Sequence, residues 1–249
     1  LPGAGGGGQR RRPRQPMSRR IWELDALRGL ALLGMMGIHF VYDLVDLFGV
    51  WNWQQPAWYL FFKNNYGAVF FLISGISVTL GSHPVKRGAQ VFLCGFLCTG
   101  VTLGMYLLGF AGKGIIIYMG VLQCLGLCMM LWPLFRRCPD WGLTALGLAM
   151  MIAGWYLRTQ AFPFWLLTPL GFAPYGFTSS DYFPLLPNLG YFLLGAVVGK
   201  RAYAGRKSLF PRETPHLGLF RWMGRHSLMI YLLHQPVLAA IVAVMAALG

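Results

Sequence analysis

Long apolar stretches separated by short polar breaks fill the chain from Leu24 onward. They cover residues 24–47, 66–82, 89–110, 114–135, 141–158, 184–201 and 227–248. A helix needs about 20 residues to cross the hydrocarbon core of a bilayer, so the pattern predicts seven membrane-spanning helices. The segment AWYLFFKNN at 57–65 predicts a further helix at the membrane interface. The expected fold class is therefore all-α, a polytopic transmembrane helical bundle with about seven spans.

The composition supports this assignment. Only 11% of the 249 residues are charged, whereas 56% are hydrophobic, and soluble domains carry about 25% charged residues. Residues 1–20 differ from the rest because they combine a glycine run with three prolines and six arginines. We expect a disordered basic leader there, with Met17 as the natural start and non-native sequence upstream of it. Residues 21–249 are expected to form a single domain.

The placement of the basic residues predicts the orientation. With a cytosolic N-terminus, 17 of the 21 Lys and Arg residues fall in cytosolic segments, whereas the outside loops contain only Lys63 and Lys113. Basic residues are enriched on the cytosolic side of membrane proteins, so we expect the N-terminus inside and the C-terminus outside. The net charge of +14 is then a topology signal that meets anionic lipid, and no nucleic-acid partner is expected.

The first span carries an unusual number of ionisable residues. At about 100° per residue, they fall within one sector of about 60° on the helix: Asp25, Arg28, His39, Asp43 and Asp46. Charged groups facing lipid are costly, so such a stripe must face the bundle interior or a wet cavity. One interpretation is a structural ladder, with Asp25 paired to Arg28 and His39 paired to Asp43. The other is catalytic, with His39 as a general base and Asp43 orienting it.

The last span begins with a second cluster, GRHSLMIYLLHQPVL. His226 lies beside Arg225 at the expected cytosolic boundary, where an interfacial role or a phosphate contact is favoured. His234 lies deeper, next to Gln235 and before Pro236, which breaks the helix and frees backbone groups. We consider Tyr231 and His234 as substrate contacts or catalytic partners, with a packed, hydrogen-bonded histidine as the alternative.

The outside loop 159–183 is aromatic, rich in proline and free of Lys and Arg. Long structured loops tend to be functional. Asp181 in this loop and Asn188 just inside the next span are candidates for binding an acceptor, although Asp181 is also placed to cap the following helix. The five cysteines, two pairs of them spaced i,i+4 on adjacent spans, indicate buried packing residues, and no metal site is expected.

Five segments in order resemble a known family. They are LDALRG at 24–29 with the R-x10-H spacing from Arg28 to His39, then IHFVYDL, FFLISGISVTLG at 70–81, DYFPLLPNLGYFLLG at 181–195 and GRHSLMIYLLHQP at 224–236. Together they resemble the bacterial proteins grouped with the catalytic domain of heparan-alpha-glucosaminide N-acetyltransferase. The Arg28 to His39 spacing also looks like the membrane acyltransferase-3 family, and both belong to a transmembrane acyltransferase superfamily.

The resemblance implies that an acetyl group moves from cytosolic acetyl-CoA to an amine or hydroxyl of a sugar or glycan outside the cell. Lipid bilayer, acyl-CoA and glycan acceptor are then the expected partners, an oligomer is compatible with it, and a bacterial cytoplasmic membrane is the expected location. His39 would be the catalytic histidine, with Arg28 as its motif partner and Asp43 beside it.

The other candidate residues divide by the side of the membrane. Candidates for the substrate site are Asp25, Asp46, Asp181, Asn188, Tyr231 and His234. Basic residues at cytosolic span ends are candidates for the phosphates of CoA: Arg87, Arg136, Arg137, Arg221, Arg225 and His226. Two alternatives stay open. A proton-coupled transporter or flippase would use the polar stripe as a proton relay, and a noncatalytic subunit of a glycan-assembly complex would use it only for packing.

Overall fold

The computed structural model describes residues 21–210 and 212–248, and this part of the chain is all-helical. The α-helices are α1 (Trp22–Tyr42), α2 (Ala57–Asn65), α3 (Gly67–Leu80), α4 (Pro84–Leu107), α5 (Val121–Phe135), α6 (Asp140–Leu157), α7 (Leu185–Ala202), α8 (Gly218–Arg225) and α9 (Ser227–Leu248). A π-helical turn, η1 (Asp43–Leu47), continues α1, and short 3-10 turns are η2 (Lys113–Ile115), η3 (Thr168–Leu170) and η4 (Pro215–Leu217).

Helices occur at all seven predicted spans and at the predicted interfacial segment 57–65. One boundary was wrong, because the predicted segment 114–135 becomes α-helical only at Val121. Residues before it form η2 and an extended stretch whose Met119 pairs with Tyr182. Helix α8 was not predicted, since eight residues are too few for a spanning pattern. The leader expected at residues 1–20 lies outside the described residues.

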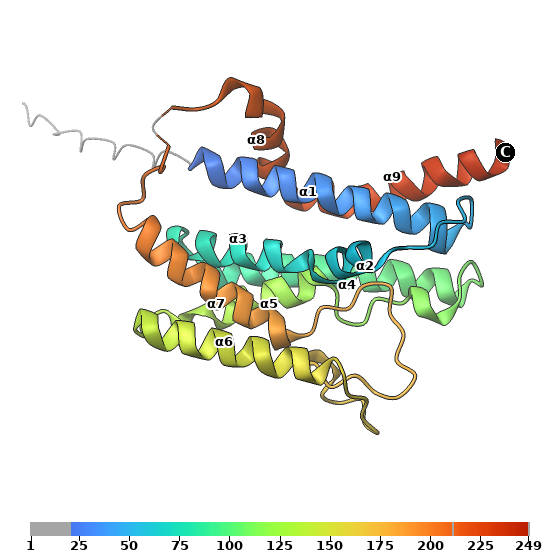
Figure 1. Cartoon of the computed structure of the whole chain (residues 1–249), viewed down its shortest axis with the longest axis horizontal. Helices are drawn as coiled ribbons and strands as arrows, with labels where there is room; N and C mark the ends of the chain where they lie inside the picture. The colour runs from blue at the N-terminus through green and yellow to red at the C-terminus, as the bar shows by residue number, and fades with distance from the viewer. Residues whose placement is uncertain (1–20, 211, 249) are drawn as a thin grey trace, which may run out of the picture.

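Within residues 21–210 and 212–248, three helices are long and apolar enough to cross a membrane. They are the continuous helix Trp22–Leu47, then Pro84–Leu107 and Ser227–Leu248. The remaining helices at predicted spans are shorter or less apolar. The helices at the predicted spans nonetheless run lengthwise through the molecule, with α7 at a slant, as Figure 1 shows.

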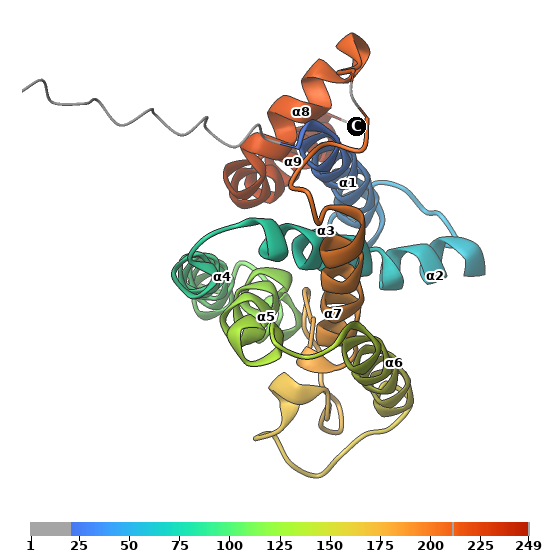
Figure 2. The same cartoon turned by 90° about the vertical axis from the view of Figure 1, so that its left-hand side faces the viewer.

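The helices pack in pairs. Helix α7 packs between α3 and α6, α4 packs on α5, and α1 packs on α8 and α9. In the end-on view of Figure 2, α1, α8 and α9 form one group beside α3, and α4 with α5 lies on the flank of the α3–α7 pair. The long loop between α6 and α7 lies at the end of the molecule opposite α8 (Figure 1).

Glycines allow the closest helix crossings. A Cβ atom on Gly75 of α3 would collide with the carbonyl of Phe192 in α7, and one on Gly195 would collide with the carbonyl of Leu72. Gly224 of α8 lies in the same way against the backbone of Asp25 in α1. Small residues at crossing points let backbones approach in membrane bundles, where apolar burial does not drive helix association. Backbone contact therefore sets how closely α3 approaches α7 and how closely α1 approaches α8.

Candidate functional site

Two histidines from the first and last helices meet inside the bundle. Nδ1 of His39 in α1 lies 2.6 Å from Nε2 of His234 in α9. The ring planes differ by only 15°, with centroids 4.9 Å apart. Rings stacked face to face would keep their atoms about 3.5 Å apart, so the shorter N···N distance means that the rings lie edge to edge and share a hydrogen bond.

The partners of His234 assign the protons of this pair. Nδ1 of His234 lies 2.5 Å from the backbone carbonyl oxygen of Tyr231. A carbonyl oxygen only accepts hydrogen bonds, so this Nδ1 carries the hydrogen and Nε2 of His234 is the acceptor. Nδ1 of His39 must then donate to it. This assignment from hydrogen-bond partners leaves Nε2 of neutral His39 as a proton acceptor, which is the nitrogen that a general base needs.

Asp43 lies one helical turn beyond His39 but bonds elsewhere. Its Oδ1 accepts from Nε2 of Gln235 at 2.7 Å, and the residue is fully buried. The predicted side-chain pairing of Asp43 with His39 is therefore wrong, because the ring of His39 is hydrogen-bonded to His234 of α9. The side chain of Asp43 therefore contacts the residue next to His234, and the ring of His39 contacts His234 itself.

The predicted polar stripe divides at the C-terminal end of α1. Asp46 is exposed and forms an ion pair with Lys63 of α2 at 3.0 Å, whereas Asp43 is buried. The prediction assumed 100° per residue throughout, but residues 43–47 form the π-helical turn η1. A π turn has more residues per turn, so it moves Asp46 off the interior face. The prediction that all five residues share one interior face is therefore wrong for Asp46.

At the other end of α1, Arg28 reaches into a cavity of about 210 Å³. Its Nη1 pairs with Asp25 at 3.1 Å, as predicted, and its Nη2 donates to Oγ of Ser77 in α3. Arg87 of α4 also lines the cavity, and the other polar residues that line it are Ser74, Ser77, Ser82 and Ser227. Two guanidinium groups with several hydroxyls suit an anion such as a phosphate.

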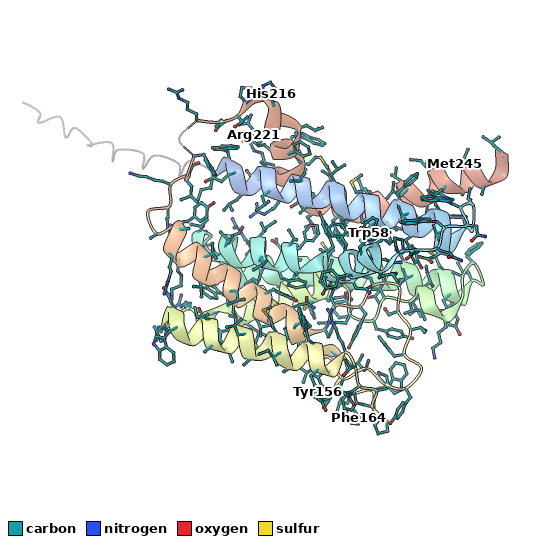
Figure 3. All side chains as sticks on the ribbon, in the orientation of Figure 1. Trp58, Tyr156, Phe164, His216, Arg221 and Met245 are labelled. Carbon is teal, nitrogen blue, oxygen red and sulfur yellow. The ribbon has the colours of Figure 1, made fainter. Side chains whose placement is uncertain are left out.

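A second hollow, of about 270 Å³, lies against α8. It is lined by Arg221, Trp222 and Arg225, together with Glu213 and Gly218. Arg221 pairs with Glu213, and its Nε is buried with no partner among the described residues. Figure 3 places Arg221 at the end of the molecule where α1 begins. Arg225 lies 3.6 Å from Asp25, which also pairs with Arg28. One carboxylate therefore contacts an arginine from each of the two hollows.

The remaining basic candidates lie outside these hollows. Nδ1 of His226 donates to the carbonyl of Trp222 at 2.9 Å, and the ring lies against that indole. Arg136 and Arg137 follow α5 at the exposed turn before α6 and line neither hollow.

Asp181 anchors the long loop between α6 and α7. Its Oδ2 accepts from the backbone N–H of Val121 at 3.1 Å. Asp181 therefore caps α5 and not α7, the helix that follows it in the chain and that the sequence suggested. The same oxygen accepts from the hydroxyl of Tyr231 at 3.4 Å. Burial raises the pKa of Asp181 to about 6, against the hydrogen bonds from Val121 and Tyr231, which lower it. Asn188 donates to the carbonyl of Pro184 at 2.7 Å inside the first turn of α7.

Several site residues were not assigned a role by the sequence. Ser74, Ser77, Trp222 and Ser227 are not among the candidate residues from the sequence. Gln235 was noticed because it precedes Pro236. Their roles depend on which helices meet, and no local pattern encodes that.

The comparisons with known proteins assign the chain to a family. A family model described as heparan-alpha-glucosaminide N-acetyltransferase, catalytic, matches residues 20–236. No curated protein and no solved structure matches. The match includes Arg28, His39, the Ser77 helix and His234, and it extends over most of the chain. The chain therefore belongs to the family of the heparan-alpha-glucosaminide N-acetyltransferase catalytic domain.

Proposed function

We propose that this protein is an integral-membrane acetyltransferase that moves an acetyl group from cytosolic acetyl-CoA to an amine or hydroxyl of a sugar on the outer side. The observation that carries the proposal is the histidine pair, because the Tyr231 carbonyl and His234 together leave Nε2 of His39 as a base. Arg28, at the other end of the same helix, lines a cavity through which the donor would enter.

We propose that the donor binds from the cytosolic side. Arg221 and Arg225 would bind phosphates of CoA in the hollow at α8, where the unpartnered Nε of Arg221 needs an acceptor. The thiol arm would pass Arg28 and Arg87 through the neighbouring cavity. Arg28 and His39 are 11 positions apart, or about 16 Å along the helix, so a long flexible arm is required between the phosphates and the reacting carbonyl.

The chemical step balances with the residues at hand. The acceptor nitrogen or oxygen attacks the thioester carbonyl while its proton moves to Nε2 of His39. The C–S bond breaks, and the departing thiolate of CoA takes the proton from Nε2 of His39, which returns His39 to its neutral form. His234 accepts the Nδ1–H of His39 and holds that ring in its orientation, and Tyr231 links His234 to Asp181 in the outer loop. Asp43 supports the pair through Gln235.

The proposed topology has seven spans with the N-terminus in the cytosol and the C-terminus outside. It is supported by the concentration of Lys and Arg in segments that fall on one side and by the lengthwise run of α1, α3, α4, α5, α6, α7 and α9 through the molecule (Figure 1). In this arrangement both basic hollows open toward the cytosol, where acetyl-CoA is made.

Acetyl-CoA binding and turnover on detergent-purified protein test the proposal. We expect acetyl-CoA to raise the melting temperature, since a ligand that binds only the native state stabilises it, and we expect slow release of CoA. His39→Ala should bind acetyl-CoA without releasing CoA, and Arg28→Ala should bind it more weakly. Arg137→Ala is the matched control, because Arg137 is exposed and lies outside both hollows. A folded, monodisperse sample with neither stabilisation nor release would overturn the proposal.

A further inference from the structure

Two buried oxygen atoms, one on Asp43 and one on Gln235, have no hydrogen-bond donor among the described residues. Asp43 accepts one hydrogen bond at Oδ1 from Gln235, but its Oδ2 is sealed from solvent and has no hydrogen-bond partner among the described residues. Oε1 of Gln235 is sealed and unpartnered in the same way. Buried polar groups in native proteins are almost always paired, so both atoms need a donor that the heavy-atom arrangement alone does not supply.

An ionised Asp43 would have no counterion. In the part of the chain that the structure describes, no basic side chain forms an ion pair with Asp43. A buried, unpaired carboxylate is among the most costly groups in a protein interior, and ionisable side chains inside membrane-spanning helices are rare and are usually paired. A single hydrogen on the carboxyl group, by contrast, provides the missing donor.

The charged and titratable groups around Asp43 do not change this balance. On its own helix, Tyr42 precedes it and His39 is hydrogen-bonded to His234 of α9. Asp46, on the same π turn, is held by Lys63 of α2 at 3.0 Å and by Gln55. Lys63, which also lies over the ring of Tyr42, is therefore engaged elsewhere.

We propose that Asp43 is held as a neutral carboxylic acid whose Oδ2–H donates to Oε1 of Gln235. With the bond from Nε2 of Gln235 to Oδ1, this hydrogen bond closes a ring between acid and amide that satisfies all four polar atoms. Asp43 is then a positioning residue. It ties the outer end of α1 to the residue that follows His234, and this part of the proposal rests on the proposed acetyltransferase function.

Infrared difference spectroscopy tests the protonation directly and without enzyme activity. At pH 8, where Asp181 with its pKa of about 6 is ionised, the wild-type protein minus Asp43→Asn should show the C=O stretch of a hydrogen-bonded carboxylic acid, with a shift in D₂O. Asp46→Asn is the matched control on the same turn, and it should remove carboxylate bands only. Gln235→Leu should move the acid band to higher frequency, because the acid loses both hydrogen bonds.

Absence of an acid band from the wild-type minus Asp43→Asn spectrum would overturn the proposal, and a band that Gln235→Leu leaves in place would overturn the assigned partner. If Asp43→Asn does not fold, Asp43→Glu retains the acid and shifts its band, which makes the same assignment.

The positioning role has its own test. Asp43→Asn can form the same ring with an amide, so it should keep CoA release within about twofold of wild type, whereas Asp43→Leu should lose most of it. Failure of all CoA release in wild type would count against the proposed function and leave the infrared result unchanged.

Discussion

The tautomer of His39 depends on a single neighbouring ring. His234 accepts the Nδ1–H of His39 and is itself fixed by the carbonyl of Tyr231. We predict that His234→Ala lowers the rate of CoA release by about 100-fold or more, the size of a general-base contribution, because Nε2 of His39 is then no longer held as the base. The KM for acetyl-CoA should change little, since the proposed donor hollows lie at the other end of α1.

His234→Gln tests whether the hydrogen bond to His39, and not only the volume of the His234 ring, supports the rate of CoA release. The amide oxygen of glutamine can accept the Nδ1–H of His39, so we expect part of the rate to return. His226→Ala is the control, because this ring directly follows α8, is exposed and lies against Trp222. An unchanged rate in His234→Ala would show that the pair has no part in catalysis.

Asp181 should make the stability of the protein depend on pH. Its pKa is raised from 3.8 to about 6 by burial, so the folded state binds the proton more tightly than the unfolded state. Its contribution is present in full below about pH 4 and is lost as the pH rises through 6. A shift of this size corresponds to up to about 3 kcal/mol.

Unfolding measurements in detergent between pH 4 and pH 7.5 check this prediction. The free energy of unfolding of wild type should fall over this range, and Asp181→Asn should remove most of the slope, because asparagine is neutral at every pH and its oxygen can still accept from Val121. A slope that persists in Asp181→Asn would assign the pH dependence to another group.

The chemistry-bearing residues of α1 could be named from the sequence, but their partners could not. Arg28 and Asp25 pair as their i,i+3 spacing predicts, because that contact lies within one helix. His39 and His234 are 195 positions apart, and their contact depends on how α1 and α9 pack. Asp46 shows the limit even of local reasoning, since one π turn moves it from the interior to the surface.

At the scale of elements, the same Gly→Ala substitution should have opposite effects at a helix crossing and away from one. Gly75→Ala would place a methyl group against the carbonyl of Phe192 in α7, and overpacking of this kind costs about 1–3 kcal/mol. Gly100→Ala in α4 meets nothing within 4 Å. Because alanine favours a helix over glycine by about 0.5–1 kcal/mol, Gly100→Ala should be neutral or stabilising.

Thermal unfolding of the two variants in the same detergent measures the difference. We expect a lower melting temperature for Gly75→Ala and an equal or higher one for Gly100→Ala. Equal melting temperatures would mean that α3 and α7 can separate to accommodate the methyl group, and the close backbone crossing would then not stabilise the bundle.

Hydropathy predicted the helices themselves well because each spanning segment must satisfy its own backbone hydrogen bonds. Helix α8 and the extended stretch before α5 were missed, since both are held by partners distant in the chain. Gly224 of α8 lies against the backbone of Asp25 in α1, and Phe183 donates its backbone N–H to Met119 at 2.7 Å. A pattern read along the chain contains neither contact.

At the scale of the whole molecule, the number of spans decides on which side the donor hollows open. A chain with only the three longest apolar helices as spans and a cytosolic N-terminus would place Lys86 outside and Lys113 and Tyr175 inside. The seven-span topology places Lys86 inside and the other two outside. All three side chains are exposed, so single cysteines at these positions give opposite labelling patterns for the two topologies.

We predict that a membrane-impermeant maleimide labels Lys113→Cys and Tyr175→Cys in intact cells and labels Lys86→Cys only after the membrane is opened. The five native cysteines lie on α4, on α5 or just after it and are buried or half-buried, and the parent protein without an added cysteine measures their background. The reverse pattern would place Arg87, next to Lys86, on the outer side. The cavity that Arg87 shares with Arg28 would then face away from acetyl-CoA, so this labelling pattern tests the direction of acyl transfer independently of any activity assay.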